Sequence, residues 1–499
     1  MTKFVPSKYQ QAVYDHINQT DRNAVIDAVA GSGKSTTIVN ALSLIPENKR
    51  VLFLAFNKAI VEELKVKVGN LNNVEIRTLH SLGMSSITKT YRTMVNSSKY
   101  GKYINSGVKY GTIKPVNELE NNEFAEWKSN IIKLTDLARN YLATNVAEIE
   151  DIAAKHDLYL HDNEAVIALN TMQWGQTNVR EIDFTDMVWF PNVLGIKVEQ
   201  FDYVFIDECQ DLNTAQRELF LKTIKPETGR FIAVGDPRQA IYGFAGADIE
   251  SFERLKNLPN TDLLPLSVCY RCDSDIIDLA KSIVPQIEAR DNAPKGTIQH
   301  DSMVQDIIDG DMVLCRITAP LVTLCMQYIA NGTKAYVKGR DIGLNLINML
   351  RRTDRVELRE AMDVLRTELS KLANKIARKQ GISIDDAKEE SQYQTFDDKL
   401  TAIENLSFGL TTVREATNRI ELIFKDNDKS GICLSTIHKA KGLEADRVFI
   451  LRQDKLYLKH CMKVAWMAEQ ERNLVYVAYT RAKKFLGFLR NDSNNNTDK

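Results

Sequence analysis

Apolar runs alternate with helical periodicity near the start of the chain. Ala24–Val29 is an almost unbroken apolar run that leads into a glycine-rich turn, and Val51–Ala55 is a second run, followed by a helical pattern over Lys58–Val68. Tyr203–Ile206 and Phe231–Val234 repeat the short apolar pattern. Short apolar runs that alternate with helices predict parallel strands covered by helices on both faces.

A different pattern separates these runs. From residue 117 to residue 170, apolar residues such as Trp127, Ile131 and Leu134 recur at spacings of three and four. This spacing places them on one face of a helix. The pattern predicts a helical insertion within the first α/β region.

A second α/β pattern begins near Leu264. A helical, charge-rich block from Ile342 to Phe424 interrupts it, and its density of Arg, Glu and Lys indicates exposed helices. The strands predicted for this region are Met312–Cys315, Ala335–Val337, Ile432–Ser435 and Val448–Leu451. The sequence therefore predicts two α/β domains, each interrupted by a helical insertion.

Composition narrows the class of protein only slightly. The chain has 499 residues and a formal net charge of −1, which neither supports nor excludes a nucleic-acid partner. No apolar run is long enough to span a bilayer, and Met1–Gln10 does not resemble a signal peptide. Seven scattered cysteines fit a reducing cytosol. Cys269 and Cys272 form a lone C-x-x-C without the second half of a zinc site, so we expect no metal there.

The turn after the first run has the composition of a phosphate-binding loop. Ala28–Ser35 matches the P-loop pattern except that Ala28 replaces the first glycine. Small residues let backbone N–H groups approach phosphate, and the following helix N-terminus favours negative charge. Lys34 would reach the β and γ phosphates and Ser35 would bind Mg²⁺. The alternative is a glycine-rich turn without a ligand.

A second element of phosphate chemistry follows the third apolar run. The apolar run Val204–Ile206 is followed directly by Asp207 and Glu208. Phosphoryl transfer needs a metal ion and a positioned water molecule. Asp207 suits Mg²⁺ binding, and Glu208 suits orienting and deprotonating the water. These two elements alone predict an enzyme that hydrolyses a nucleoside triphosphate.

Further motifs carry a more specific resemblance. Asp207–Asp211 reads D-E-C-Q-D, Val234–Tyr242 reads V-G-D-P-R-Q-A-I-Y, and Cys269–Cys272 reads C-Y-R-C. The other matching segments are Tyr9–Val13, Thr78–Ser81, Asp183–Met187, Ser435–Glu444, Glu471 and Tyr476–Lys483. Together these segments resemble superfamily 1 DNA helicases of the UvrD/Rep/PcrA type, in the order in which that family carries them.

The resemblance implies an α/β fold with two RecA-like parallel-sheet motor domains, each with a helical insertion. The first motor domain is expected at 1–82 and 183–263, around a helical insertion at 83–182. The second is expected at 264–340 and 429–490, around a reduced helical insertion at 341–428. Residues 491–499 are expected to be a disordered tail.

The resemblance also implies an ATP site with Mg²⁺. The expected catalytic residues are Lys34, Asp207, Glu208, Gln239, Arg271 and Arg481, with Ser35 and Asp207 as the metal ligands. The expected nucleotide-binding residues are Gln10, Ala30, Gly31, Ser32, Gly33, Lys34, Ser35, Thr36, Tyr270, Arg271, Gly442, Glu444 and Arg481. Arginine fingers stabilise transition-state charge by a factor of about 10³–10⁵. The alternatives are a surface salt bridge for each arginine and a core position for Tyr270.

A strand-tracking face is implied as well, since single-stranded DNA binding needs aromatic rings beside polar contacts. The residues expected on it are Asn57, Thr78, His80, Tyr242, Phe244 and His438. His80 has the alternative of an ordinary loop histidine. The chain departs from the family in having Ala245 in place of Arg, and Phe56 beside Ala55, which moves an aromatic by one position.

The function implied is a monomeric 3′→5′ helicase or translocase in a bacterial or phage-type cytosol, without a membrane partner. Its expected partners are single-stranded DNA and 3′-tailed duplex DNA, together with repair or replication proteins. Two alternatives stay open. One is a translocase that strips proteins from DNA, and the other is an ATP-gated DNA-binding subunit that recruits repair, recombination or defence partners.

Overall fold

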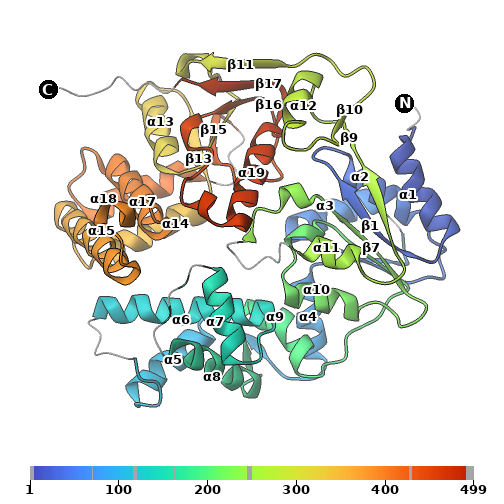
Figure 1. Cartoon of the computed structure of the whole chain (residues 1–499), viewed down its shortest axis with the longest axis horizontal. Helices are drawn as coiled ribbons and strands as arrows, with labels where there is room; N and C mark the ends of the chain where they lie inside the picture. Colours follow the sequence, from blue (N-terminus) through green and yellow to red (C-terminus); the bar gives the residue numbers. More distant parts are fainter. Residues whose placement is uncertain are drawn as a thin grey trace. The chain divides into compact units, whose positions relative to one another are not determined.

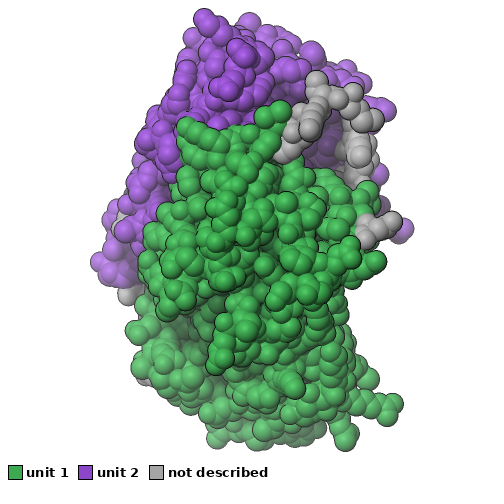
Figure 2. Space-filling model, turned by 90° about the vertical axis from the view of Figure 1, so that its right-hand side faces the viewer, with its two compact units in different colours: residues 1–29, 33–267 green, residues 30–32, 268–499 purple. Residues whose placement is uncertain are grey.

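The computed structural model describes residues 5–490, apart from 70, 116–120, 157, 159, 161–162, 244–249 and 426–429. The chain divides into two compact units, one of residues 1–29 and 33–267 and the other of residues 30–32 and 268–499 (Figure 2). The predicted tail at 491–499 and Phe244 lie outside the described residues.

The first unit is built on a parallel sheet (Figure 1). Ala24 and Ile26 face one apolar core, while Val25 faces another, so the strand between them is buried on both faces. In the described part of the chain the sheet has six strands, in the order β3 (Val74–Arg77), β2 (Val51–Leu54), β6 (Tyr203–Ile206), β7 (Arg230–Gly235), β1 (Asn23–Ala28) and β8 (Thr261–Leu266).

Helices connect these strands, as parallel pairing requires. They are α1 (Lys8–Gln19), α2 (Lys34–Leu42), α3 (Lys58–Val68), α4 (Leu79–Thr88), α9 (Phe184–Val193), α10 (Thr214–Lys222) and α11 (Ser251–Lys256). Side-chain caps start several of them. Asn57 caps α3, Thr78 caps α4, and Asp183 caps α9.

A helical segment lies between α4 and α9 in the sequence. It consists of α5 (Lys99–Lys109), α6 (Asn121–Tyr141), α7 (Val146–Lys155) and α8 (Glu164–Thr177). A short parallel pair, β4 (Met94–Val95) and β5 (Glu181–Ile182), brackets it. α4 passes through residue 83 without a break, so the domain boundary placed there stays a prediction.

The second unit also has a parallel sheet. In the described residues its seven strands follow the order β11 (Thr297–Ser302), β17 (Ala482–Leu489), β16 (Ala445–Ile450), β12 (Met312–Cys315), β15 (Ile432–Thr436), β13 (Ala335–Lys338) and β14 (Phe424–Lys425). β9 (Val268–Cys269) and β10 (Glu288–Ala289) form a separate parallel pair. The predicted α/β class with two parallel sheets and helical insertions is confirmed.

Helices accompany this sheet, among them α12 (Ser274–Ala280), α13 (Ala319–Ala330) and α19 (Ala465–Tyr479). A second helical segment comprises α14 (Arg340–Arg351), α15 (Leu358–Gln380), α16 (Ile384–Lys388), α17 (Ser391–Ser407) and α18 (Val413–Ile423). Within the described ranges, no helix is long and apolar enough to cross a membrane.

One strand differs from the sequence expectation. The second α/β region was expected from residue 264, but β8 pairs with β1 and belongs to the first sheet. The first unit ends at Ser267. β8 lies at the sheet edge, where Pro265 is tolerated and polar Thr261 and Asp262 meet solvent, so it lacks the apolar pattern of a central strand.

Candidate functional site

The loop after β1 has the backbone of a phosphate cradle. Gly31 and Gly33 have φ angles of 68° and 76°, in the left-handed region that favours glycine. Gly33 is the N-cap of α2 and offers no side-chain cap, so the first N–H groups of the helix are not bonded by it. Ser32 Oγ is buried without a hydrogen-bond partner among the described residues. Free donors at a helix N-terminus favour an anion such as phosphate.

Lys34 and Glu208 form an ion pair within the first unit. Lys34 Nζ donates to Glu208 Oε1 at 2.7 Å. Burial opposes the charge of Lys34, but Glu208 and Asp207 outweigh that effect and raise the pKa of Lys34, so it stays cationic. Glu208 has a φ of 53°, a strained value for a residue with a side chain, and its N–H donates to Asp207 Oδ1 at 2.9 Å.

Hydrogen bonds extend from this pair to the end of the next strand. Gln210 Nε2 donates to Glu208 Oε2 at 2.5 Å, and the Asp236 N–H donates to Gln210 Oε1 at 3.1 Å. Gln239 Nε2 in turn donates to Asp236 Oδ2 at 2.7 Å. A continuous chain of contacts therefore joins Gln239 to Lys34 across the carboxyl ends of neighbouring parallel strands, where such sheets bind ligands.

Burial affects the ionisation of one acidic group at this site. Asp236 is fully buried, and burial raises the pKa of its carboxyl group despite the positive charge of Arg238. Arg238 NH2 also lies 2.7 Å from Asp27 Oδ1.

Asp207 follows β6 directly, and Ser35 lies in the first turn of α2, so a carboxylate and a hydroxyl are the oxygen donors offered to Mg²⁺. This donor type and the glycine cradle fit a metal-bound nucleoside triphosphate.

The residue expected to read adenine has a structural role as well. Gln10 is buried, its Nε2 donates to Thr37 Oγ1 at 3.1 Å, and its Oε1 accepts from the Ser7 N–H at 3.0 Å. The bond from Ser7, together with the Gln10 N–H that donates to Ser7 Oγ at 3.2 Å, forms a capping box at the start of α1. Gln11 is exposed. Thr36 is also exposed on α2. Adenine recognition by Gln10 stays a prediction.

The second unit brings together the two predicted arginine fingers. Arg271 Nε donates to Glu444 Oε2 at 2.7 Å, and Arg271 NH1 donates to the Thr480 carbonyl at 3.1 Å. Arg481 is buried and donates to the carbonyl oxygens of Val477 and Leu443 at 3.0 and 2.9 Å. The burial of Arg481 does not match the surface salt bridge considered as an alternative, whereas Arg271 does form an ion pair with the partly exposed Glu444, so its role as an arginine finger stays a prediction.

The predicted nucleotide-binding residues Tyr270, Arg271, Gly442 and Glu444 come from two distant segments of the chain, which the Arg271–Glu444 contact joins. Although burial raises the pKa of Glu444, hydrogen bonds and charges from Lys483 and Arg271 outweigh it and leave the pKa below its usual value. Gly442 has a φ of 86°, which a side chain would strain. Tyr270 is 41% exposed, so it is not the core tyrosine of the alternative hypothesis. Its exposed ring is available for stacking.

Residues 30–32 group with the second unit. The Ala30 N–H donates to Tyr476 Oη at 2.8 Å, and the Tyr270 N–H donates to the Gly31 carbonyl at 2.8 Å. A Cβ atom at Gly31 would lie only 2.6 Å from Arg271 Cβ. This position therefore excludes any side chain, in addition to requiring a positive φ.

The predicted strand-tracking residues of the first unit lie at helix starts and loops. Asn57 Oδ1 and Thr78 Oγ1 accept the N–H groups of Ile60 and Ser81, so both cap helices. His80 lies in the first turn of α4, and burial lowers its pKa below the usual value, which keeps the ring neutral. A neutral ring can stack on a base but supplies no charge to a phosphate.

Two aromatic pairs accompany these positions. The rings of Tyr242 and Phe56 are nearly parallel, with centroids 6.4 Å apart and planes at 13°. The rings of His80 and Phe184 meet edge to face, with centroids 6.5 Å apart. In the second unit, burial lowers the pKa of His438 far below its usual value.

Two family models match the chain. The UvrD/REP helicase N-terminal domain matches residues 8–260, and the UvrD-like helicase C-terminal domain matches residues 348–492. The chain belongs to the UvrD-like helicase family. The first matched range contains the Lys34–Glu208 pair, and the second contains Arg481.

Similar proteins are named as DNA helicases. F-box DNA helicase 1 of Gallus gallus is 23% identical over 96% of this chain and 48% of its own length. ATP-dependent DNA helicase Rep of Buchnera aphidicola is 25% identical over 54% of this chain and 44% of its own length. A probable DNA helicase II homolog of Mycoplasma pneumoniae is 22% identical over 93% of this chain and 81% of its own length. The chain thus spans about half the length of the first two of these relatives.

Two phenylalanines, Phe56 and Phe184, were not among the site residues predicted from the sequence. Their side chains are 46% and 61% exposed, and each pairs with an aromatic residue that was selected. The available signal was an aromatic residue within a family motif. The exposure of Phe56 and Phe184 depends on where β2 ends and where α9 begins, and the sequence pattern does not show this.

Proposed function

We propose that this chain is an ATP-driven motor that moves 3′→5′ along single-stranded DNA and separates duplexes. The observation that carries the proposal is the chain of contacts from Lys34 through Glu208, Gln210 and Asp236 to Gln239. These contacts connect Lys34, the lysine proposed to bind the phosphates, to Gln239, which follows β7. A cytosolic location and a monomeric state belong to the same proposal.

Each residue has a chemical role in this proposal. Lys34 neutralises the β and γ phosphates of ATP, and the loop N–H groups orient them. Glu208 exchanges its contact with Lys34 for the attacking water and accepts its proton. Mg²⁺, held by Ser35 and Asp207, would supply charge neutralisation at the phosphate oxygens. Gln239 contacts the γ phosphate and transmits its loss through Asp236.

The second unit contributes positive charge and the base contact. Arg271 and Arg481 stabilise charge on the transferred phosphoryl group, by a factor of about 10³–10⁵ in arginine-finger enzymes. Tyr270 stacks on adenine, and Glu444 binds the ribose. ATP then favours one arrangement of the two motor domains and its hydrolysis favours another, which is a population shift driven by differential affinity.

DNA binding in the proposal uses aromatic rings beside polar side chains. Asn57, Thr78, His80 and Tyr242 lie in the first unit, and His438 lies in the second. Phe244, outside the described residues, completes the predicted set. Stacking of bases on aromatic rings contributes about 1–3 kcal/mol per base and tolerates any sequence.

A strand-separation assay tests the proposal. The chain, ATP and Mg²⁺ are incubated with duplexes that carry a 3′ tail, a 5′ tail or no tail, with RNA duplexes as controls. We expect separation of the 3′-tailed DNA alone. Separation that requires a 5′ tail contradicts the polarity. ATP turnover that rises with single-stranded DNA but produces no separation favours the protein-stripping translocase, and tight ATP-dependent binding with negligible turnover favours the recruiting subunit.

A further inference from the structure

Phe184 is an exposed aromatic ring at the start of a helix. It is the first residue of α9, it is 61% exposed, and its edge-to-face partner is His80. The direction of such a ring depends on how firmly the first turn of its helix is held. The surroundings of that turn therefore determine what the ring can contact.

The two helices that carry this pair touch closely. A Cβ atom at Gly83 in α4 would lie 1.8 Å from the Met187 carbonyl oxygen in α9, so the two backbones are in direct contact. His80 lies one turn before Gly83, and Phe184 lies one turn before Met187. The contact sets how closely α4 and α9 approach each other beside the His80–Phe184 pair.

Buried charges hold the start of α9. Asp183 caps the helix by accepting the Asp186 N–H at 2.8 Å, and Asp186 Oδ2 accepts the Asp183 N–H at 3.1 Å. Arg139 NH1 donates to both carboxylates, at 2.9 Å for Asp183 and 2.7 Å for Asp186, and Arg139 NH2 donates to Asp183 Oδ2 at 2.8 Å. One guanidinium from α6 thus grips both residues of the capping box.

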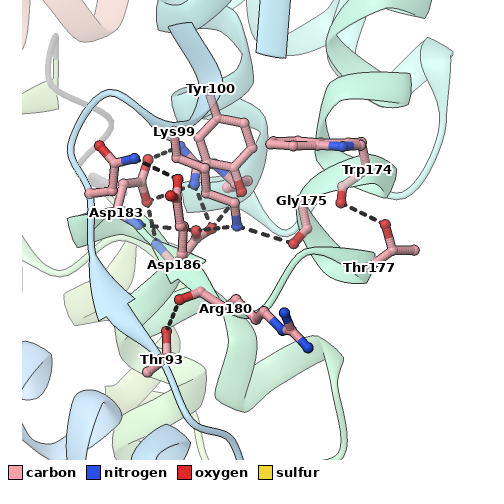
Figure 3. Close-up of polar contacts among 12 residues, drawn as sticks. Thr93, Lys99, Tyr100, Trp174, Gly175, Thr177, Arg180, Asp183 and Asp186 are labelled. Atoms are coloured by element: carbon pink, nitrogen blue, oxygen red, sulfur yellow. Dashed lines mark hydrogen bonds and ion pairs between the residues drawn. The ribbon is translucent and has the colours of Figure 1, made fainter. Parts of the chain in front are cut away.

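A second cation reaches the same carboxylate from α5. Lys99 Nζ donates to Asp186 Oδ2 at 2.8 Å, and Tyr100 Oη donates to Asp186 Oδ1 at 2.6 Å. Figure 3 shows both side chains directed toward Asp186, with Gly175 of α8 on the other side. A Cβ atom at Gly175 would lie 2.3 Å from Tyr100 Oη, so the site is closed around these groups.

This network exceeds what a helix cap needs. A capping box satisfies the N-terminal N–H groups by itself. The side chains of Lys99, Arg139 and Asp186 have no exposed surface, and burying such charges costs more free energy than an apolar cluster of similar volume. Burial lowers the pKa of Lys99 despite the opposing effect of Asp186, a sign of that cost. A costly buried network with defined geometry indicates a requirement for orientation.

We propose that Lys99 and Arg139 are positioning residues for DNA binding, which act through Asp183 and Asp186 to orient the ring of Phe184 toward a base of single-stranded DNA. The inference rests on the proposed function. It gives the first helical segment a role in binding, since α5 and α6 supply the two cations. An aromatic ring that is held in advance binds a base without paying the full cost of ordering.

Equilibrium binding of a fluorescently labelled oligothymidylate tests the proposal in a double-mutant cycle. Phe184→Ala should weaken binding about 5- to 150-fold, the equivalent of one stacked base. Arg139→Lys keeps the charge but loses the fork that grips two carboxylates, and should weaken binding about 3- to 10-fold. Because Arg139 acts through Phe184, the double variant should bind no more weakly than Phe184→Ala.

A structural role alone gives a different result. Ile131→Ala, in the same helix but in the separate apolar cluster around Trp127, is the matched control and should leave oligonucleotide binding unchanged. If Arg139→Lys folds poorly, Tyr100→Phe replaces it, since it removes one hydrogen bond to Asp186 and keeps the ring beneath Arg139. Additive losses in the cycle, or equal weakening by Ile131→Ala, contradict the proposal.

Failure of this inference is distinct from failure of the proposed function. A wild-type chain whose ATP turnover does not respond to single-stranded DNA contradicts the motor function itself. A wild-type chain that responds, while Arg139→Lys and Tyr100→Phe bind oligothymidylate as tightly as wild type, contradicts only the positioning role.

Discussion

The first unit contains two clusters in which positive and negative side chains pair, and the clusters differ in their access to solvent. The side chains of Lys34 and Glu208 are 14% and 20% exposed, whereas those of Lys99, Arg139 and Asp186 are 0% exposed. The first cluster includes a strained residue, Glu208, and the second satisfies its carboxylates through a capping box and two cations. An accessible, strained pair suits a group that must exchange partners during a reaction, while a closed network suits one that must not move.

Substitution at the accessible pair should have the largest effect, and on chemistry. Glu208→Gln removes the carboxylate that is proposed to accept a proton from water, so we expect kcat for ATP hydrolysis to fall by about 10²–10⁴. The amide keeps the size of the side chain, so ATP binding should persist. Steady-state turnover together with equilibrium nucleotide binding measures both effects.

The control for this substitution is Glu218→Gln, which changes an exposed carboxylate of the same unit that pairs with Arg217. It should change neither quantity. If Glu208→Gln kept the full rate of ATP hydrolysis, the Lys34–Glu208 pair would have a structural role only. It would then not differ in function from the buried network of Lys99, Arg139 and Asp186.

Substitution in the closed network should act on stability instead. Asp186→Asn leaves Lys99 and Arg139 buried with less compensating charge, and we expect the free energy of unfolding to fall by about 3–5 kcal/mol. Urea denaturation followed by tryptophan fluorescence measures the loss, since Trp174 and Trp189 lie beside Lys99 and Arg139.

Asp136 offers a matched comparison, because it binds the same guanidinium but its side chain is 41% exposed. Asp136→Asn should lower the free energy of unfolding by about 1 kcal/mol or less. Equal losses for the two aspartates would show that burial does not set the strength of this network.

His156 is a buried histidine near two lysines. Its ring lies 3.0 Å from Tyr141 Oη, and burial together with Lys155 and Lys133 lowers its pKa from 6.5 to about 4. The unfolded chain therefore binds a proton more readily, and stability falls as the pH drops below about 6.5. Between pH 7 and pH 5 the loss should be about 1–2 kcal/mol.

His156→Gln keeps a polar group near Tyr141 and removes the titration. The difference in unfolding free energy between pH 7 and pH 5 should therefore be smaller in the variant than in the wild type. Denaturation curves at both pH values measure it, and identical pH dependence in the two proteins would assign the effect to other histidines.

The comparison also shows what sequence could predict. The strands β1, β2, β6 and β7 were predictable because both of their faces are buried, which leaves unbroken apolar runs. β8 was not, because an edge strand with Pro265 has no such run. Lys34 and Glu208 could be placed near each other from the sequence, because each follows a predicted strand within a phosphate-binding or acidic motif.

The buried network could not be predicted from the sequence. Lys99, Arg139 and Asp186 are far apart in the chain, and a charged residue in an amphipathic pattern is normally expected on the solvent side. Their meeting depends on how α5, α6 and α9 pack. The same holds for Phe184, whose motif was recognised while its exposure was not.

The most direct test of the account is the rate of ATP hydrolysis by the wild-type chain and by Lys34→Ala, each with and without single-stranded DNA. The account predicts that the wild-type rate rises strongly when DNA is added. It also predicts that Lys34→Ala is at least about 10²-fold slower in both conditions. A Lys34→Ala chain that hydrolyses ATP as fast as the wild type would contradict the assignment of the Lys34–Glu208 pair as the catalytic centre.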